Sequence, residues 1–130
     1  MALVADTRFL LTYYFPPNKE AAEKIQKFMI SIVDRLIIPT IVVVEFIKIA
    51  GKRMGYEASR LRIRILESRG SKIVPFTTED ANIAGEILLK KPNIPFADAC
   101  IASIAKRLKS KIVSDDPHFR ELEVETIWPL

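Results

Sequence analysis

Short apolar runs alternate with longer segments of helical periodicity along the chain, and this alternation constrains the fold more than any other feature. The runs are Ala2–Ala5, Leu36–Ile38, Lys72–Val74, Lys111–Val113 and, more weakly, Glu123–Ile127. Runs of this kind are typical of strands in a sheet that is covered on both faces. We therefore expect a sheet that lies between layers of helices.

Between the runs lie segments whose apolar residues recur at helical spacing. They are Lys19–Val33, Thr40–Gly51, Tyr56–Arg69, Thr78–Lys90 and Pro95–Leu108. The second segment opens with a threonine cap and closes at a glycine, and the fourth has an acidic first turn. Strands that alternate with helices imply parallel β-α-β units. The prediction is an α/β fold, a three-layer α/β/α sandwich with a central parallel sheet.

Length and composition narrow the class of protein further. A chain of 130 residues has room for one packed core, and without a linker or repeat we expect a single domain over residues 1–130. The single cysteine, Cys100, cannot form an internal disulfide, which favours a reducing compartment. The sequence has neither a signal-peptide pattern nor an apolar run long enough for a membrane span. These features predict a cytoplasmic protein without membrane association.

Two acids stand where predicted strands end. Asp6 follows the first run, and Asp116 with its neighbour Asp115 follows the run Lys111–Val113. In open parallel sheets ligands bind outside the carboxyl ends of the strands, so both positions are candidates for a site. Each also has a structural explanation, since aspartate caps helices and forms turns.

Two further acids lie on predicted helices. Glu45 has Ile41 and Ile49 one turn to either side, and a carboxylate in an apolar stripe is costly unless it is paired or bound to a cation. A salt bridge to Lys48 is the structural alternative. Asp98 lies in the first turn of the last long helix, where the helix dipole alone can explain it.

The four acids together indicate more than each one does alone. Two strand ends and two helices can place them over one edge of one sheet, where they repel unless a cation neutralises them. Oxygen ligands suit Mg²⁺ or Mn²⁺. With four glycines and one histidine, the chain excludes a phosphate-binding P-loop and a histidine-rich metal site. That histidine, His118, is expected to be a surface or capping residue.

Four stretches, in this order, resemble the motifs of the PIN-domain nucleases, in particular the small VapC-type toxins of prokaryotic toxin–antitoxin pairs. VADTRFLLTYYF is similar to the first motif, and the proline-led IPTIVVVEFIKIAGKR to the glutamate-bearing second. IPFADACIASIAKRL resembles the third, an aspartate before an alanine-rich helix. KIVSDDPHFREL is similar to the fourth, with Ser114 in the place of a threonine. Matching Phe119 to the motif's phenylalanine puts the fourth acid on Asp116 and leaves Asp115 at a variable position.

This resemblance implies Mg²⁺- or Mn²⁺-dependent hydrolysis of RNA phosphodiesters. The implied catalytic residues are Asp6, Glu45, Asp98 and Asp116, of which Asp6, Asp98 and Asp116 are metal ligands, with Thr7, Ser114 and Asp115 as auxiliary groups. Glu45 is expected to bind the cation or to orient the attacking water. The family resemblance also implies a homodimer and an antitoxin partner. The arginines of one helix are candidates for contacting RNA phosphates, although a solvated face is the more common reason for such a run. They are Arg60, Arg62, Arg64 and Arg69.

Three other classes of protein fit the sequence less well. A receiver-like domain needs an acidic pair after the first strand, and a haloacid-dehalogenase-type phosphatase needs an aspartate two residues after the first, where this chain has Arg8. A non-catalytic PIN-like module that binds RNA or protein is the third alternative. All four acidic positions are filled, which favours catalysis.

Overall fold

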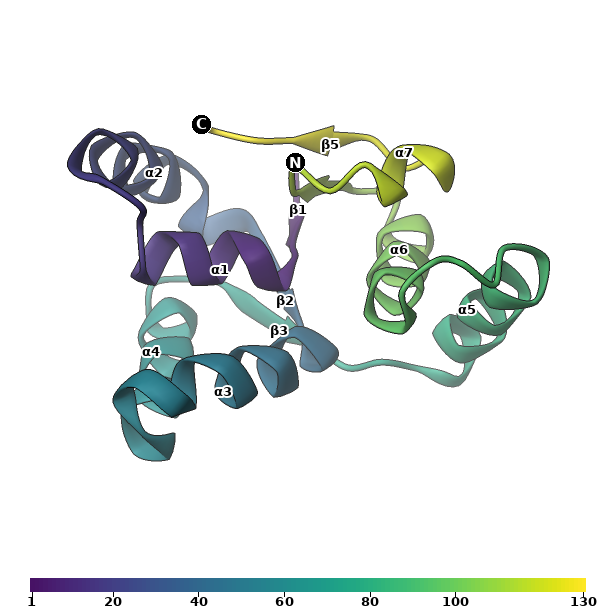
Figure 1. Cartoon of the computed structure of the whole chain (residues 1–130), viewed down its shortest axis with the longest axis horizontal. Coiled ribbons are helices and arrows are strands. Elements are labelled where there is room, and N and C mark those ends of the chain that lie inside the picture. The colour runs from purple at the N-terminus through teal and green to yellow at the C-terminus, as the bar shows by residue number, and fades with distance from the viewer.

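The computed structural model describes all 130 residues, which form one five-stranded parallel sheet between helices (Figure 1). The strands are β1 (Leu3–Ala5), β2 (Leu36–Pro39), β3 (Lys72–Val74), β4 (Lys111–Val113) and β5 (Thr126–Ile127). Their order across the sheet is β3-β2-β1-β4-β5. All neighbouring strands run parallel, with Leu3 of β1 opposite Leu36 on one side and Lys111 on the other. The carboxyl ends of all five strands therefore lie at one edge.

The helices form the two outer layers of the predicted sandwich. They are α1 (Thr7–Tyr14), α2 (Lys19–Ile32), the short 3-10 helix η1 (Val33–Arg35), α3 (Thr40–Met54), α4 (Tyr56–Ser68), α5 (Thr78–Lys90), α6 (Phe96–Leu108) and α7 (His118–Glu121). In Figure 1, α1 to α4 lie on one side of the sheet and α5 and α6 on the other. The predicted three-layer parallel α/β architecture is confirmed. None of the helices combines the length and the hydrophobicity needed to cross a bilayer.

The core is built around β1 and α6. All three residues of β1 are buried, as are all four of β2. Residues 99–105 of α6 are buried without interruption, so this helix is enclosed on every side. Its alanines let neighbouring backbone approach closely, and full enclosure of this kind fixes the helix start at Pro95 and Phe96 relative to the sheet.

Several predicted boundaries were wrong for local reasons. The helix predicted to stop at Gly51 continues to Met54 and ends at Gly55, which has a φ of 88°. Thr40 is not its cap, because Pro39 takes that position and the Thr40 hydroxyl accepts a hydrogen bond from the Phe76 N–H at 3.2 Å. At the C-terminal edge, the predicted strand Glu123–Ile127 shrinks to β5, because Glu123 has a positive φ of 61°.

Candidate functional site

Four acids from four separate segments line one pocket at the carboxyl edge of the sheet. Asp6 follows β1, Glu45 lies on α3, Asp98 is in the first turn of α6 and Asp116 follows β4. The pocket has a volume of about 330 Å³. Its remaining walls are mainly apolar and include Leu11, Ile49, Pro95, Ala97 and Ile101. The convergence expected from the sequence is the arrangement found in the structure.

Asp6 serves the fold and the pocket at once. Its Oδ1 accepts the Phe9 N–H at 2.8 Å and so caps α1. The residue is only 5% exposed. Burial raises the pKa of Asp6 to about 6, although the hydrogen bonds from Ser114 and Phe9 lower it and the nearby Asp115 and Asp116 charges raise it further. Asp6 therefore holds a proton only below about pH 6, and at neutral pH a nearby cation would stabilise its buried charge.

Asp98 and Asp116 form a coupled pair. Burial, the hydrogen bond with Asp116 and the Asp116 charge raise the pKa of Asp98 to about 7. Burial also acts on Asp116, but the hydrogen bonds from the His118 N–H and from Asp98 outweigh it and lower the pKa of Asp116. Without a cation and below about pH 7, the pair holds one proton, which lies mainly on Asp98.

Glu45 is half-buried and faces the pocket rather than the core. The core face of α3 carries Val42, Phe46 and Ala50. The Thr7 hydroxyl donates a hydrogen bond to Glu45 Oε1 at 2.5 Å, and Glu45 forms no ion pair with Lys48. Of the two isoleucines beside it, Ile49 lines the pocket and Ile41 packs against the core, so Glu45 stands where the apolar face opens into the pocket.

Ser114 connects two of the acids. It is buried, its Oγ accepts the Asp116 N–H at 2.9 Å, and it hydrogen-bonds the Asp6 carboxylate. Asp115 does not line the pocket, but its Oδ1 pairs at 3.2 Å with Nε of Arg8, which does. The structure thus places Ser114 between the acids and Asp115 at their margin.

His118 belongs to the site, although the sequence predicted a surface or capping role. Its Nδ1 lies 2.7 Å from Asp116 Oδ1 and 3.2 Å from Asp98 Oδ2. These three side chains form a group whose ligand atoms all lie within 4.8 Å of one another. The sequence position of His118 could have indicated this role. It stands two residues after Asp116, so the turn that carries the acid also carries the imidazole.

The structure does not bring the four arginines of α4 into the pocket. Arg60, Arg62, Arg64 and Arg69 lie on or just after α4, and none of them lines the pocket. Arg60 pairs with Glu57 at 3.5 Å, and Arg69 donates a hydrogen bond to the Tyr13 hydroxyl at 3.4 Å. Their candidate role in contacting RNA therefore concerns a surface separate from the acids.

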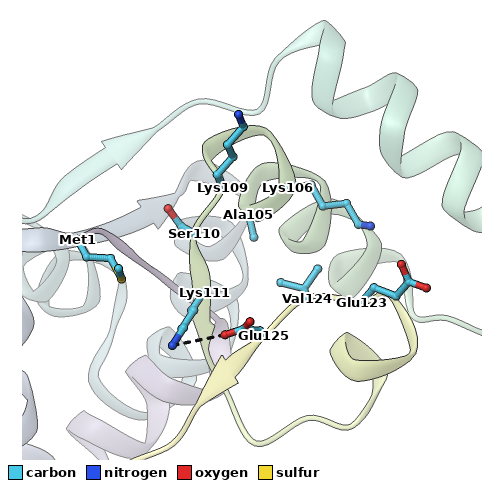
Figure 2. A pocket seen from close by; sticks show the side chains of 9 residues that line it. All are labelled: Met1, Ala105, Lys106, Lys109, Ser110, Lys111, Glu123, Val124 and Glu125. Carbon is cyan, nitrogen blue, oxygen red and sulfur yellow. Dashed lines mark ion pairs between the residues drawn. The ribbon is translucent and has the colours of Figure 1, made fainter.

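A second hollow lies at the amino ends of β1 and β4, opposite the acids (Figure 2). Three lysines and two glutamates line it, and Lys111 pairs with Glu125 at 3.4 Å. The charges there are of both signs, and no group of converging metal ligands is present. The chemistry of the molecule is concentrated at the carboxyl edge.

The parallel α/β sandwich and the four acids at its carboxyl edge together define a class of protein, the α/β domains with an acidic pocket at the ends of the strands. The sequence profile of the PIN domain matches residues 3–125, and the chain belongs to the PIN-domain family. No curated protein sequence matches the chain significantly.

Solved structures share this fold over nearly the whole chain. DNA-bound VapBC from Salmonella typhimurium is 20% identical, with a TM-score of 0.78 and coverage of 100% of this chain and 99% of that one. FitAcB from Neisseria gonorrhoeae is 23% identical, with a TM-score of 0.75 and 98% coverage of both chains. Mycobacterium tuberculosis VapC20, described as a toxin that cleaves the sarcin-ricin loop, is 15% identical, with a TM-score of 0.76 and coverage of 95% and 96%.

Proposed function

We propose that this protein is a divalent-cation-dependent endoribonuclease and the toxin of a VapBC-type toxin–antitoxin pair. The observation that carries the proposal is the convergence of Asp6, Glu45, Asp98 and Asp116 on one pocket. Membership of the PIN-domain family and the likeness of the fold to VapC and FitB toxins support it.

The residues present fit a hard divalent cation. Asp6, Asp98 and Asp116 would supply carboxylate oxygens, which suit Mg²⁺ or Mn²⁺. Burial raises the pKa of Asp6 and of Asp98, and neighbouring carboxylates raise both pKa values further, so a bound cation would stabilise their charged forms. When bound there, such a cation supplies Lewis-acid activation of a water and stabilisation of the leaving oxygen of a phosphodiester.

The protein's own groups orient this chemistry. Thr7 fixes the Glu45 carboxylate toward the pocket, where it is placed to take the proton of an attacking water. Ser114 holds Asp6 and the backbone of Asp116 in register, as groups behind metal ligands do. The apolar walls lower the local polarity, which strengthens the electrostatic contacts made against them.

The proposed toxin role is based on structural relatives that were solved in complexes with other molecules. The Salmonella relative was solved as a DNA-bound VapBC complex and the Neisseria relative as FitAcB. We propose by analogy that this chain acts in the cytoplasm as a homodimer and that an antitoxin protein inhibits it. The non-catalytic PIN-like module is disfavoured because all four acidic positions are filled.

Cleavage of RNA by purified protein tests the proposal. We expect Mg²⁺ or Mn²⁺ to support cleavage of a structured RNA panel and EDTA to stop it. Asp98→Asn should abolish cleavage while circular dichroism shows an intact fold. Asp115→Asn, which alters an acid outside the pocket, is the matched control and should retain activity. Undiminished cleavage in EDTA, or by Asp98→Asn, would contradict the proposal.

A further inference from the structure

The imidazole of His118 lies against two of the acids that line the pocket. Its Nδ1 is buried and lies 2.7 Å and 3.2 Å from carboxylate oxygens of Asp116 and Asp98, distances at which a protonated ring would form ion pairs with both. Despite these short distances, Nδ1 has no hydrogen bond of good geometry.

The distances from Nδ1 to the two carboxylate oxygens are compatible with three ligands around a common centre. Neighbouring ligands of an octahedral ion at 2.0–2.1 Å are separated by about 3.0 Å. The two distances from Nδ1 bracket this value. Because Nδ1 has no hydrogen-bond partner, its lone pair in the neutral imidazole would be available to bind a cation.

The backbone holds the imidazole in this place. His118 is the first residue of α7, and its N–H donates to Asp116 Oδ1 at 2.9 Å. The next residue, Phe119, is fully buried and anchors α7 in the core. His118 is thus presented to the acids by a fixed turn, and 35% of its side chain is still accessible to solvent.

We propose that His118 Nδ1 binds the cation directly, together with Asp98 and Asp116, and makes the site prefer Mn²⁺ over Mg²⁺. Mg²⁺ keeps oxygen ligands and bound waters, whereas transition metals accept imidazole nitrogen. Mn²⁺ combines both preferences, because it takes carboxylates as readily as Mg²⁺ does and tolerates nitrogen. This inference rests on the proposed metal-dependent function, and it names a ligand and a selectivity for that site.

Pulsed electron paramagnetic resonance of bound Mn²⁺ tests the direct bond. His118 is the only histidine in the chain, so growth on ¹⁵N-histidine labels a single imidazole in the tag-free full-length protein. We expect nitrogen modulation from directly bound imidazole, its change to the ¹⁵N pattern on labelling, and its loss in His118→Ala. Titration calorimetry should show a Mn²⁺ affinity at least tenfold weaker in His118→Ala, with the Mg²⁺ affinity changed less than about twofold.

Two further variants separate the possible outcomes. Arg120→Gln, at an exposed position on the same short helix, should leave both affinities within about twofold of the unchanged protein. Asp98→Asn should weaken both cations. Binding of Mn²⁺ that needs Asp98 but shows no histidine nitrogen would overturn the ligand assignment and leave the proposed function intact. If Mn²⁺ and Mg²⁺ both fail to bind, or bind equally to Asp98→Asn, the metal-dependent function itself fails.

Discussion

Replacing Asp6 with asparagine should stabilise the metal-free protein at pH 8. Asp6 is 5% exposed, and its pKa rises from the ordinary value of 3.8 to about 6 in the folded chain. A difference of about two pH units corresponds to roughly 3 kcal/mol of free energy. Because the folded state holds the proton more tightly than the unfolded state, ionisation of Asp6 opposes folding.

The sign of this effect fixes its pH window. The cost of the charged Asp6 is absent below about pH 4, grows as the pH rises and is complete above about pH 6. Asparagine has no such charge, and its side-chain oxygen can still accept the Phe9 N–H that caps α1. Allowing about 1 kcal/mol for a weakened hydrogen bond with Ser114, we expect a net gain of about 2 kcal/mol at pH 8 and about 0.5 kcal/mol at pH 5.

Urea denaturation in EDTA, followed by circular dichroism at pH 5 and pH 8, measures this gain. The control is Asp115→Asn, whose carboxylate pairs with the exposed Arg8 and should change the free energy of unfolding by less than about 0.5 kcal/mol at either pH. If Asp6→Asn gains no stability between pH 5 and pH 8, the account of Asp6 as an electrostatically costly group is refuted. Asp6→Asn should also lose cation binding, which would mean that the charged Asp6 lowers the stability of the fold but is needed by the site.

Three other changes have defined outcomes. Mn²⁺ at 100 times its dissociation constant should stabilise the protein by about 2.7 kcal/mol, and Asp98→Asn should remove this gain in a thermal melt. Arg107→Ala should lower the free energy of unfolding by about 3–5 kcal/mol, measured by urea denaturation. The reason is that the Arg107 guanidinium contacts both carboxylate oxygens of the fully buried Asp80, at 2.7 Å and 2.9 Å. A decrease below about 1 kcal/mol would contradict this. Phe119→Ala should cost about 3–5 kcal/mol and, by freeing α7, weaken Mn²⁺ binding, whereas unchanged binding would show that α7 does not position the site.

The parts of the fold that the sequence predicted well are those governed by local patterns. The strands at Lys72–Val74 and Lys111–Val113 match to the residue, because apolar runs between turn residues have few alternatives. Gly51 was misread as a helix end: packing of α3 on α4 outweighs the cost of about 1 kcal/mol for a glycine within a helix. A single-residue propensity cannot anticipate a contact between two helices.

The site divides in the same way. The positions of Asp6 and Asp116 at strand ends follow from the pattern, since parallel strands share one edge. The hydrogen bond from Thr7 to Glu45 joins residues 38 positions apart, and the contact of His118 with Asp98 depends on how α7 packs against α6. Such relations arise only once the sheet order is fixed, so no local pattern carries them.

The pairing of β1 with β4 has a consequence for the order of synthesis. Leu3 lies beside Lys111, so the central strand acquires its second neighbour only when the last quarter of the chain is present. A sheet that pairs such distant strands forms slowly, because the entropy of closing a long loop is lost before the contacts between the strands stabilise it. The acids at positions 6 and 116 meet across this same seam. A chain still emerging from the ribosome therefore lacks the pocket in which these acids meet.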